Sequence, residues 1–329
     1  MLRYILRRLL WAIPTLVIVT FIVYCALRLA TNPLASYAKA NPRIARQPGK
    51  IKQYIEVNGL WNGPSGYLRG YWKWLSGFLT GDWQPSIKGS RPVWPNLKDA
   101  LVNSIRLGLV ASFVGIVVGL ALGVFAALRP GRLRDSVVNT GALIGYSVQP
   151  FISAVLLQLF FSVQWSKWFG EPLFPTSGMY PPGHKGFDPV LMLKYMALPV
   201  IVVSIQSIAA YSRYMRASLL DVLTSDYLRT ARAKGISERR VLVKHALRNA
   251  LVPIVTLAAL DIGSIVGGLI ISEGVFEYPG MGKFFLNAQG NGDFPELMPW
   301  MVIITSSVII FNLVADLAYA WLDPRIRLD

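Results

Sequence analysis

LGLVASFVGIVVGLALGVFAAL, residues 107–128, contains no charged side chain. A helix needs about 20 apolar residues to cross the hydrocarbon core of a bilayer, so this stretch is long enough to span a membrane. The rest of the chain has the same character, because 53% of its 329 residues are hydrophobic, 15% are charged and the mean hydropathy is +0.45. A soluble domain carries about 25% charged residues. The sequence therefore predicts a membrane protein.

Comparable apolar runs recur along the chain. Helices fit them better than barrel strands, which would alternate apolar and polar residues. The sequence therefore predicts an all-α membrane protein with six transmembrane helices, at residues 9–27, 107–128, 136–166, 195–212, 249–272 and 297–322.

The net charge of +16 and the pI of about 10.1 are expected for a membrane protein with basic cytoplasmic loops. In a soluble protein such a balance would suggest a nucleic-acid partner, but membrane proteins keep Lys and Arg in their cytoplasmic loops. Basic residues precede the first span, and the short loops at 129–135 and 213–248 are basic as well. The loop at 273–296 is acidic. Both termini are therefore expected in the cytoplasm, with a large extracytoplasmic loop at about 30–100, which is long enough to escape the charge rule.

The N-terminal segment resembles a secretory signal, with a basic start and an apolar run. A signal's apolar core has about 7–15 residues, and the run at 9–27 is longer, so we expect an uncleaved first span. The single cysteine, Cys25, lies inside that span and excludes an internal disulfide or a cysteine zinc cluster.

Two further features leave alternatives open. The large loop carries Tyr67, Tyr71, Trp72, Trp74 and Phe78, which suit either a segment at the membrane interface or a packed external cap. Glycines at four-residue spacing favour close helix packing within one bundle, although packing against a second copy is the alternative. These glycines are Gly115, Gly119 and Gly123; Gly141 and Gly145; Gly263 and Gly267.

No constellation typical of an enzyme is present. There is no HExxH, and GMGKFF (280–285) lacks the first glycine and the Ser or Thr of a phosphate-binding loop. Asp261 and Asp316 are the only acids inside predicted spans, and an acid at that depth is a functional candidate. Asp316 has a structural alternative, because Arg325 or Arg327 could neutralise it. A role for Asp261 would suit a proton-coupled secondary transporter, whose folds often show inverted repeats that this sequence lacks.

DYLRTARAKGISERRVLVKHALRNALVP, residues 226–253, is a basic island between apolar runs. Leu220, Leu223, Tyr227, Leu228 and Ala231 share one helical face. A glycine at 235 suits a left-handed helix stop, and a serine at 237 suits the cap of a second helix. The island is therefore predicted to be two short helices with a bend between them. An interfacial amphipathic hairpin is the simplest alternative, and a nucleic-acid site is disfavoured by the apolar face.

The island closely resembles the EAA loop in permease subunits of binding-protein-dependent ABC importers. The match is to the oligopeptide and dipeptide branch, and to the first of its two permeases. RRLLWAIPTLVIVTFIVY, WKWLSGFLTGDW, YSRYMRASLLDVLTSDYLRTARAKG, SEGVFEYPGMG and NLVADLAYAWLDPRIR resemble further family segments in the same order, so the resemblance covers nearly the whole chain. Arg229, Thr230 and Ala231 stand where the general motif has Glu-Ala-Ala, and SVQPF (147–151) carries an extra Gln149.

The resemblance implies the type I ABC importer transmembrane fold. It implies residues 1–98 as N-terminal helix and extracytoplasmic loop, residues 99–322 as permease core with a coupling loop at about 213–250, and residues 323–329 as cytoplasmic tail. The expected partners are a second homologous permease, two ATPase subunits or domains, an extracytoplasmic substrate-binding protein, the peptide and the lipid bilayer, with no nucleic acid. ATP and magnesium would bind the ATPases, so no cofactor, metal or catalytic residue is expected in this chain of the bacterial cytoplasmic membrane. Nickel, glutathione, sugars and other small solutes are alternative cargo.

The resemblance also implies functional residues. The ATPase-coupling residues are expected at Asp226, Tyr227, Leu228, Arg229, Thr230, Ala231, Arg232, Ala233, Lys234 and Gly235. Among these, Tyr227, Leu228 and Ala231 are expected to fill a groove of the ATPase, and Arg229, Arg232 and Lys234 to pair at its rim. Polar residues of the transport pathway are sought at Asn139, Ser147, Gln149, Gln158, Gln206 and Asp261, although hydrogen bonds between helices would explain them equally well.

Overall fold

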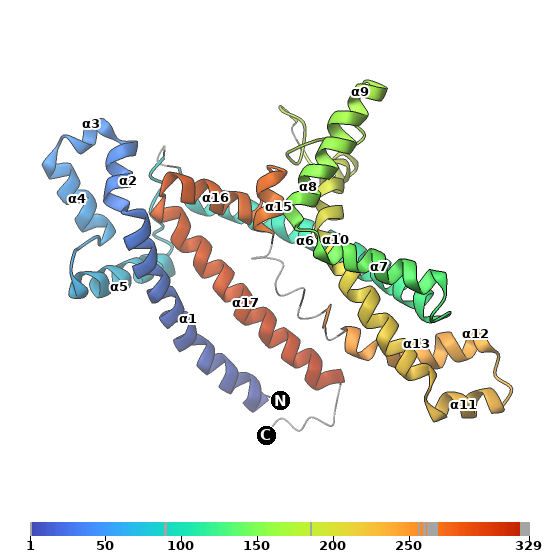
Figure 1. The fold of residues 1–329 in the computed structure, drawn as a ribbon. Coiled ribbons are helices and arrows are strands. Elements are labelled where there is room, and N and C mark those ends of the chain that lie inside the picture. Colours follow the sequence, from blue (N-terminus) through green and yellow to red (C-terminus); the bar gives the residue numbers. More distant parts are fainter. Residues whose placement is uncertain are drawn as a thin grey trace. The chain divides into compact units, whose positions relative to one another are not determined.

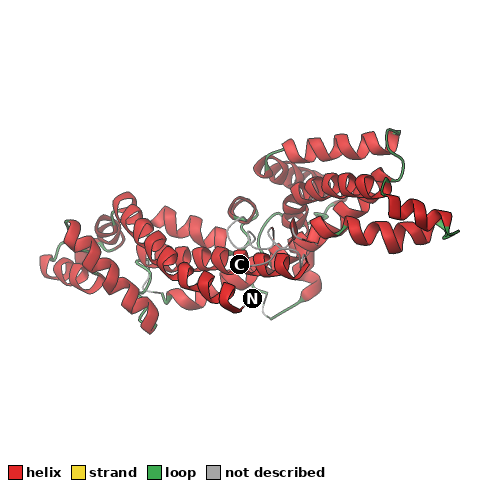
Figure 2. Cartoon of the chain, turned by 90° about the horizontal axis from the view of Figure 1, so that it is seen from below, coloured by secondary structure: helices red, strands yellow, loops and turns green. Residues whose placement is uncertain are grey.

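The computed structural model describes residues 2–88, 91–184, 186–255, 257–258, 261 and 269–322, and these ranges contain helices but no strand (Figure 2). The chain divides into two units. The first comprises the residues through Ser104 together with Pro279–Ile310, and the second comprises Ile105–Tyr278 and the described residues from Phe311 onward.

The α-helices of the two units are labelled in Figure 1. Those of the first unit are α1 (Leu2–Thr31), α2 (Pro33–Ala40), α3 (Pro42–Ala45), α4 (Pro48–Asn58), α5 (Pro64–Thr80) and α16 (Met281–Asn291). Those of the second are α7 (Leu133–Ser147), α8 (Pro150–Gln158), the π-helix η1 (Leu159–Gln164), α9 (Trp165–Phe169), α10 (Pro189–Leu223), α11 (Asp226–Ala233), α12 (Glu238–Arg240), the π-helix η2 (Val241–Ala246), α13 (Leu247–Ala250) and α15 (Ile270–Val275). Two helices begin in the first unit and continue into the second, α6 (Val93–Ala127) and α17 (Phe294–Leu322).

Four stretches in the described helices are long and apolar enough to cross a membrane, namely Leu10–Thr31, Val93–Ala127, Pro189–Leu223 and Phe294–Phe311. A fifth candidate is the pair Leu133–Ser147 and Pro150–Phe169, which is bent by 99°. The sixth predicted span, at 249–272, is described only in part, because residues 256, 259–260 and 262–268, which include the glycines at 263 and 267, lie outside the described residues. The structure thus supports four or five of the predicted spans by length and composition.

The predicted span at 136–166 is not one straight helix, which corrects the sequence-based expectation. Val148 and Gln149 are extended, and α8 restarts with Pro150 in its first turn. Proline disfavours helical backbone in the residue before it, so α7 cannot run smoothly into α8. The absence of charged residues in this run concealed the break.

The helix predicted at 195–212 is longer at both ends. Asp188 caps α10 by accepting hydrogen bonds from the backbone amides of Val190 and Leu191, each at 3.0 Å. Pro189 follows at the first helical position, where its missing amide proton costs nothing. At the other end α10 continues to Leu223, so the first part of the predicted coupling loop is a helical stalk.

Glycines of α6 pack against α10 within the second unit. A Cβ atom on Gly115 would lie 2.7 Å from Ser207 Cβ, and one on Gly119 would lie 2.7 Å from Tyr211 Cβ. Ser204 donates across the same interface to the carbonyl of Ala111 at 2.9 Å. Close packing inside one chain therefore accounts for this glycine stripe.

The first unit folds much of the large loop as helices with a buried aromatic cluster. Each of α2 to α5 has a proline at one of its first positions. In α5, the Tyr71 hydroxyl lies 2.8 Å from Thr20 Oγ1 of α1, and the Tyr71 ring packs edge-on against Tyr24 at 5.6 Å. Gly70 permits this approach, because a Cβ there would lie 2.5 Å from the Tyr24 hydroxyl. One face of α5 is therefore packed against α1.

Candidate functional site

The basic island folds as two short helical segments joined by a bend. α11 runs from Asp226 to Ala233, and Gly235 follows with φ +76°. The amide of Ile236 then bonds to the carbonyl of Ala231, which closes the end of the helix. Ser237 occupies the cap position of α12 as expected, but its hydroxyl makes no cap hydrogen bond. The second segment passes from α-helix to π-helix and back through α12, η2 and α13.

The apolar face of α11 packs against its own chain. Leu228 is 0% exposed and Ala231 is 8% exposed, and both belong to a buried cluster with Leu219, Val241 and Ala246. This corrects the expectation that Leu228 and Ala231 fill a groove of a partner, because their side chains already fill the space between α10 and the second segment. Only Tyr227 of the expected groove residues is exposed, at 43%.

Polar contacts fix α11 in place. Asn249 of α13 donates its side-chain amide to the Tyr227 hydroxyl at 2.7 Å. Arg232 forms an ion pair with Glu238 of α12, at 2.8 Å between Nε and Oε1. Both contacts cross the bend at Gly235, so the island is a braced hairpin.

The outward face of α11 is basic and exposed. Arg229 approaches Asp226 at 3.5 Å, but both side chains are largely exposed, and such pairs contribute little to stability. The residues of this face are Asp226, Tyr227, Arg229, Thr230, Arg232, Ala233, Lys234 and Gly235.

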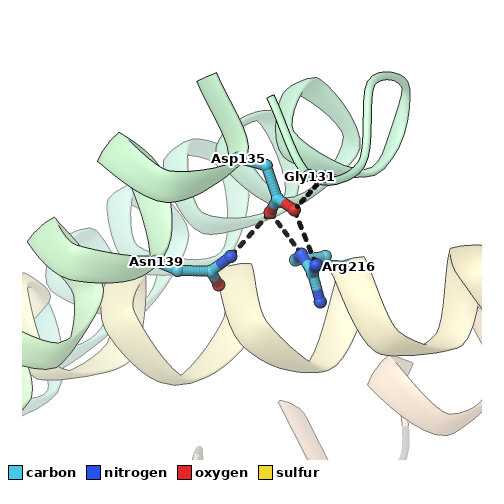
Figure 3. A network of polar contacts seen from close by, with 4 residues as sticks. All are labelled: Gly131, Asp135, Asn139 and Arg216. Carbon is cyan, nitrogen blue, oxygen red and sulfur yellow. Dashed lines mark hydrogen bonds and ion pairs between the residues drawn. The ribbon is translucent and has the colours of Figure 1, made fainter. Parts of the chain in front are cut away.

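A second polar cluster lies around Asp135, the last residue of the short basic loop 129–135. Asp135 is buried, and its carboxylate accepts from Arg216 Nε at 2.5 Å, Arg216 NH2 at 2.7 Å, Asn139 Nδ2 at 2.6 Å and the Gly131 amide at 2.9 Å (Figure 3). The bidentate guanidinium contact ties α7 to the stalk of α10. Sequence reasoning missed this pair, although Asp135 is the one acid in a basic loop.

The polar residues proposed for a pathway do not form one cluster within the described residues. Asn139 belongs to the Asp135 cluster, and Ser147 donates to the Leu143 carbonyl of its own helix at 2.8 Å. Gln158 donates to the Thr176 carbonyl at 2.8 Å. Hydrogen bonds within a helix, or from a helix to a neighbouring element, therefore explain these three polar residues.

The remaining pathway candidates, Asp261, Gln149 and Gln206, differ in their hydrogen bonding. Asp261 accepts a 2.6 Å hydrogen bond from the Tyr211 hydroxyl of α10. No hydrogen bond joins the Gln149 or Gln206 side chain to another described residue. These two stay candidates for contact with a solute. The side chain of Asp316 falls outside the described ones, and in the described part of the chain no three His, Cys, Asp or Glu side chains gather as a metal site would require.

Comparison with known proteins adds independent findings. Residues 119–328 match the family described as "Binding-protein-dependent transport system inner membrane component". A putative peptide permease of Brucella ovis is 37% identical, covering 99% of each chain. The oligopeptide transport system permease protein AppB of Bacillus subtilis is 36% identical over 99% of this chain and 100% of its own. The dipeptide transport system permease protein DppB of Escherichia coli K12 is 30% identical over 99% of each chain.

Two solved structures share the fold. An inward-facing methionine ABC transporter, MetNI, aligns with a TM-score of 0.55 at 18% identity, over 71% of this chain and 99% of its own. An amino acid ABC transporter with histidines aligns with a TM-score of 0.51 at 13% identity, over 74% and 96%. The fold is therefore the type I ABC importer transmembrane fold, and the chain belongs to the family of binding-protein-dependent transport system inner membrane components.

Proposed function

We propose that this chain is the permease subunit of an ATP-driven importer of oligopeptides or dipeptides. Relatives carrying peptide-permease names align over essentially the whole chain, which supports peptide cargo over other small solutes. The chain forms half of the translocation pathway in the bacterial cytoplasmic membrane, with both termini in the cytoplasm.

The chain works with partners in this scheme. A second homologous permease completes the pathway, an extracytoplasmic binding protein delivers the peptide, and two ATPase subunits or domains bind ATP and magnesium. This chain has no catalytic role, and its task is to convert ATPase closure into a change between inward-open and outward-open states.

The observation that carries the coupling role is the braced hairpin at the end of the α10 stalk. Leu228 and Ala231 anchor α11 to its own chain, while the Tyr227 contact with Asn249 and the Arg232 pair with Glu238 hold its angle. The hairpin is therefore rigid, and a force on the exposed face of α11 is transmitted to α10 and α13. Arg229 and Lys234 are the cations best placed to meet an ATPase, because Arg232 is engaged within the hairpin.

The bend at Gly235 provides the test. No other atom lies within 4 Å of a Cβ built at this position, so a side chain there would not clash. The backbone angle φ of +76° is nevertheless strained for residues with a side chain, although asparagine tolerates it better than most. We expect Gly235→Val to lower ATP-driven uptake of a labelled dipeptide in proteoliposomes about fivefold or more, because one or two kcal/mol of strain changes an equilibrium by that much. Gly235→Asn, which tolerates the left-handed conformation, should keep most of the uptake.

Recovery of the whole complex is measured alongside uptake, so that failed assembly is not mistaken for failed coupling. Uptake by the Gly235→Val complex at the wild-type rate would contradict the coupling role. Failure of the wild-type complex to take up any peptide, with another solute transported instead, would contradict the peptide assignment.

A further inference from the structure

The ion pair between Asp135 and Arg216 joins two helices that have different places in the coupling scheme (Figure 3). The helix α10 carries the braced hairpin at its end, whereas α7 leads to the break at Val148 and Gln149, after which α8 begins. The scheme above follows a force from the hairpin into α10 and α13 only. The ion pair extends that route to a further helix of the same unit.

Asp135 is one of two buried residues in α7, and the other is Ala142. The apolar side chains of Val137, Leu143 and Ile144 are between 58% and 60% exposed, so they contribute little to holding α7 within this chain. The Asp135 carboxylate accepts four hydrogen bonds, two of them from the fork of the Arg216 guanidinium. This polar anchor therefore carries much of the attachment of α7 to α10.

The two helices also meet far from the ion pair. A Cβ atom on Gly145, near the other end of α7, would lie 3.2 Å from Ile205 Cγ2 and 4.0 Å from Ala209 Cβ of α10. Residue 135 thus meets residue 216, while residue 145 meets residues 205 and 209, so the helices run antiparallel. Contact near both ends of α7 makes α7 and α10 one packed pair.

We propose that Asp135 and Arg216 are positioning residues for transport, which make α7 move together with α10 when the braced hairpin is displaced. Separating a buried carboxylate from its guanidinium leaves a charge without compensation, which is strongly unfavourable. The pair therefore stays closed through the cycle, and the movement reaches the break before α8, where Gln149 is a candidate for contact with a solute. The assignment rests on the proposed importer function and adds α7 to the parts that move.

The first test measures the amount of labelled dipeptide taken up per ATP hydrolysed, with the complete transporter and its binding protein in proteoliposomes. Arg216→Gln should lower this ratio about fivefold or more, because a released α7 no longer follows α10. Arg216→Lys keeps the charge without the fork and should lower the ratio less. Arg129→Gln, on an exposed arginine of the loop that contains Asp135, is the matched control and should keep the wild-type ratio.

A purely structural role of the ion pair would give a different result. Failed folding lowers the amount of complex recovered, but it leaves the ratio of uptake to hydrolysis unchanged in the complexes that remain. A wild-type ratio in Arg216→Gln therefore overturns the proposal.

A disulfide between α7 and α10 tests the joint movement directly. The Cβ separation of 4.0 Å between positions 145 and 209 lies within the range of disulfides. Gly145→Cys and Ala209→Cys are combined with Cys25→Ser, which removes the single cysteine of the chain. We expect the oxidised transporter to take up dipeptide as the reduced one does. With Arg216→Gln added, oxidation should restore most of the uptake per ATP.

Uptake that is lost on oxidation and regained on reduction overturns the proposal, because α7 would then have to move against α10. A ratio that oxidation does not raise in the Arg216→Gln background overturns it as well. If the wild-type complex takes up dipeptide in these experiments, only this inference fails and the proposed importer function stands. If the wild-type complex transports another solute instead, the peptide assignment fails, and the same ratios are measured with that solute.

Discussion

At the scale of single residues, Arg28 shows how a cation is accommodated at the end of an apolar helix. It is 7% exposed, and NH2 donates to the Trp61 carbonyl at 2.9 Å while NH1 reaches the Tyr24 hydroxyl at 3.3 Å. Its guanidinium lies 4.2 Å from the centroid of the Tyr67 ring. A planar group with several donors satisfies these three contacts together, and the ammonium of a lysine does not.

We therefore expect Arg28→Lys to destabilise the folded protein by about 1–2 kcal/mol, the sum of a lost hydrogen bond and a weakened cation–π contact. The measurement is the midpoint of thermal unfolding in detergent. Arg69→Lys is the matched control, because Arg69 is exposed and its guanidinium lies 4.6 Å from the centroid of the Trp61 ring. An equal shift in both variants would contradict the specific role of Arg28.

At the scale of elements, the α6–α10 contact depends on the absence of side chains along one stripe. A Cβ on Gly123 would lie 2.6 Å from the Ser212 carbonyl oxygen and 2.7 Å from Met215 Cβ. The first of these is a backbone atom, which cannot turn aside as a side chain can. Any larger residue must therefore push the two helices apart.

Gly123→Ala is expected to destabilise the protein by about 1–3 kcal/mol through overpacking. Gly141→Ala in α7 is the control, since no other atom lies within 4 Å of a Cβ at Gly141, and alanine favours helix by up to about 1 kcal/mol. Thermal unfolding of both variants gives the comparison. Destabilisation by the Gly141 change and none by the Gly123 change would show that this packing is assigned wrongly.

At the scale of the whole molecule, contacts distant in sequence decide how the chain closes on itself within each unit. Asp293, between α16 and α17, accepts from Ser86 Oγ at 2.6 Å and from the Ile87 amide at 2.9 Å. The carboxylate is buried, and burial raises the pKa of Asp293 above its ordinary value although the donated hydrogen bonds lower it. One acid thus holds the segment around Ser86 against the C-terminal part of the same unit.

This pKa shift predicts a pH dependence. The folded state holds the proton of Asp293 more tightly than the unfolded chain, so its contribution to stability is full below the ordinary value of about 3.9 and is lost as pH rises through the raised value. Asp293→Asn keeps an oxygen for Ser86 and Ile87 and carries no titrating proton. We expect the unfolding temperature of the wild type, relative to Asp293→Asn, to fall between pH 4 and pH 7. A relative rise over this interval would contradict the direction of the shift.

The sequence predicted the helical membrane class, most of the spans and the two-segment island with its bend at Gly235. These follow from hydrophobic runs and from glycine's backbone freedom, which are local properties. It did not predict the break at Val148 and Gln149, because the run carries no charge and only the backbone reveals how Pro150 redirects it. It also placed Leu228 and Ala231 on a binding face, because helical periodicity identifies an apolar face without saying what covers it.

By itself, then, the sequence determined that this chain crosses a membrane as helices and carries a basic island with a bend at its glycine, since the cost of burying charge and the preference for helix act along the chain. Only the tertiary structure decided which groups meet: Arg216 with Asp135, Asn249 with Tyr227, and Tyr180 with no partner in the described chain. Those pairings depend on distances between residues far apart in sequence. Such distances are set by packing, which no local pattern encodes.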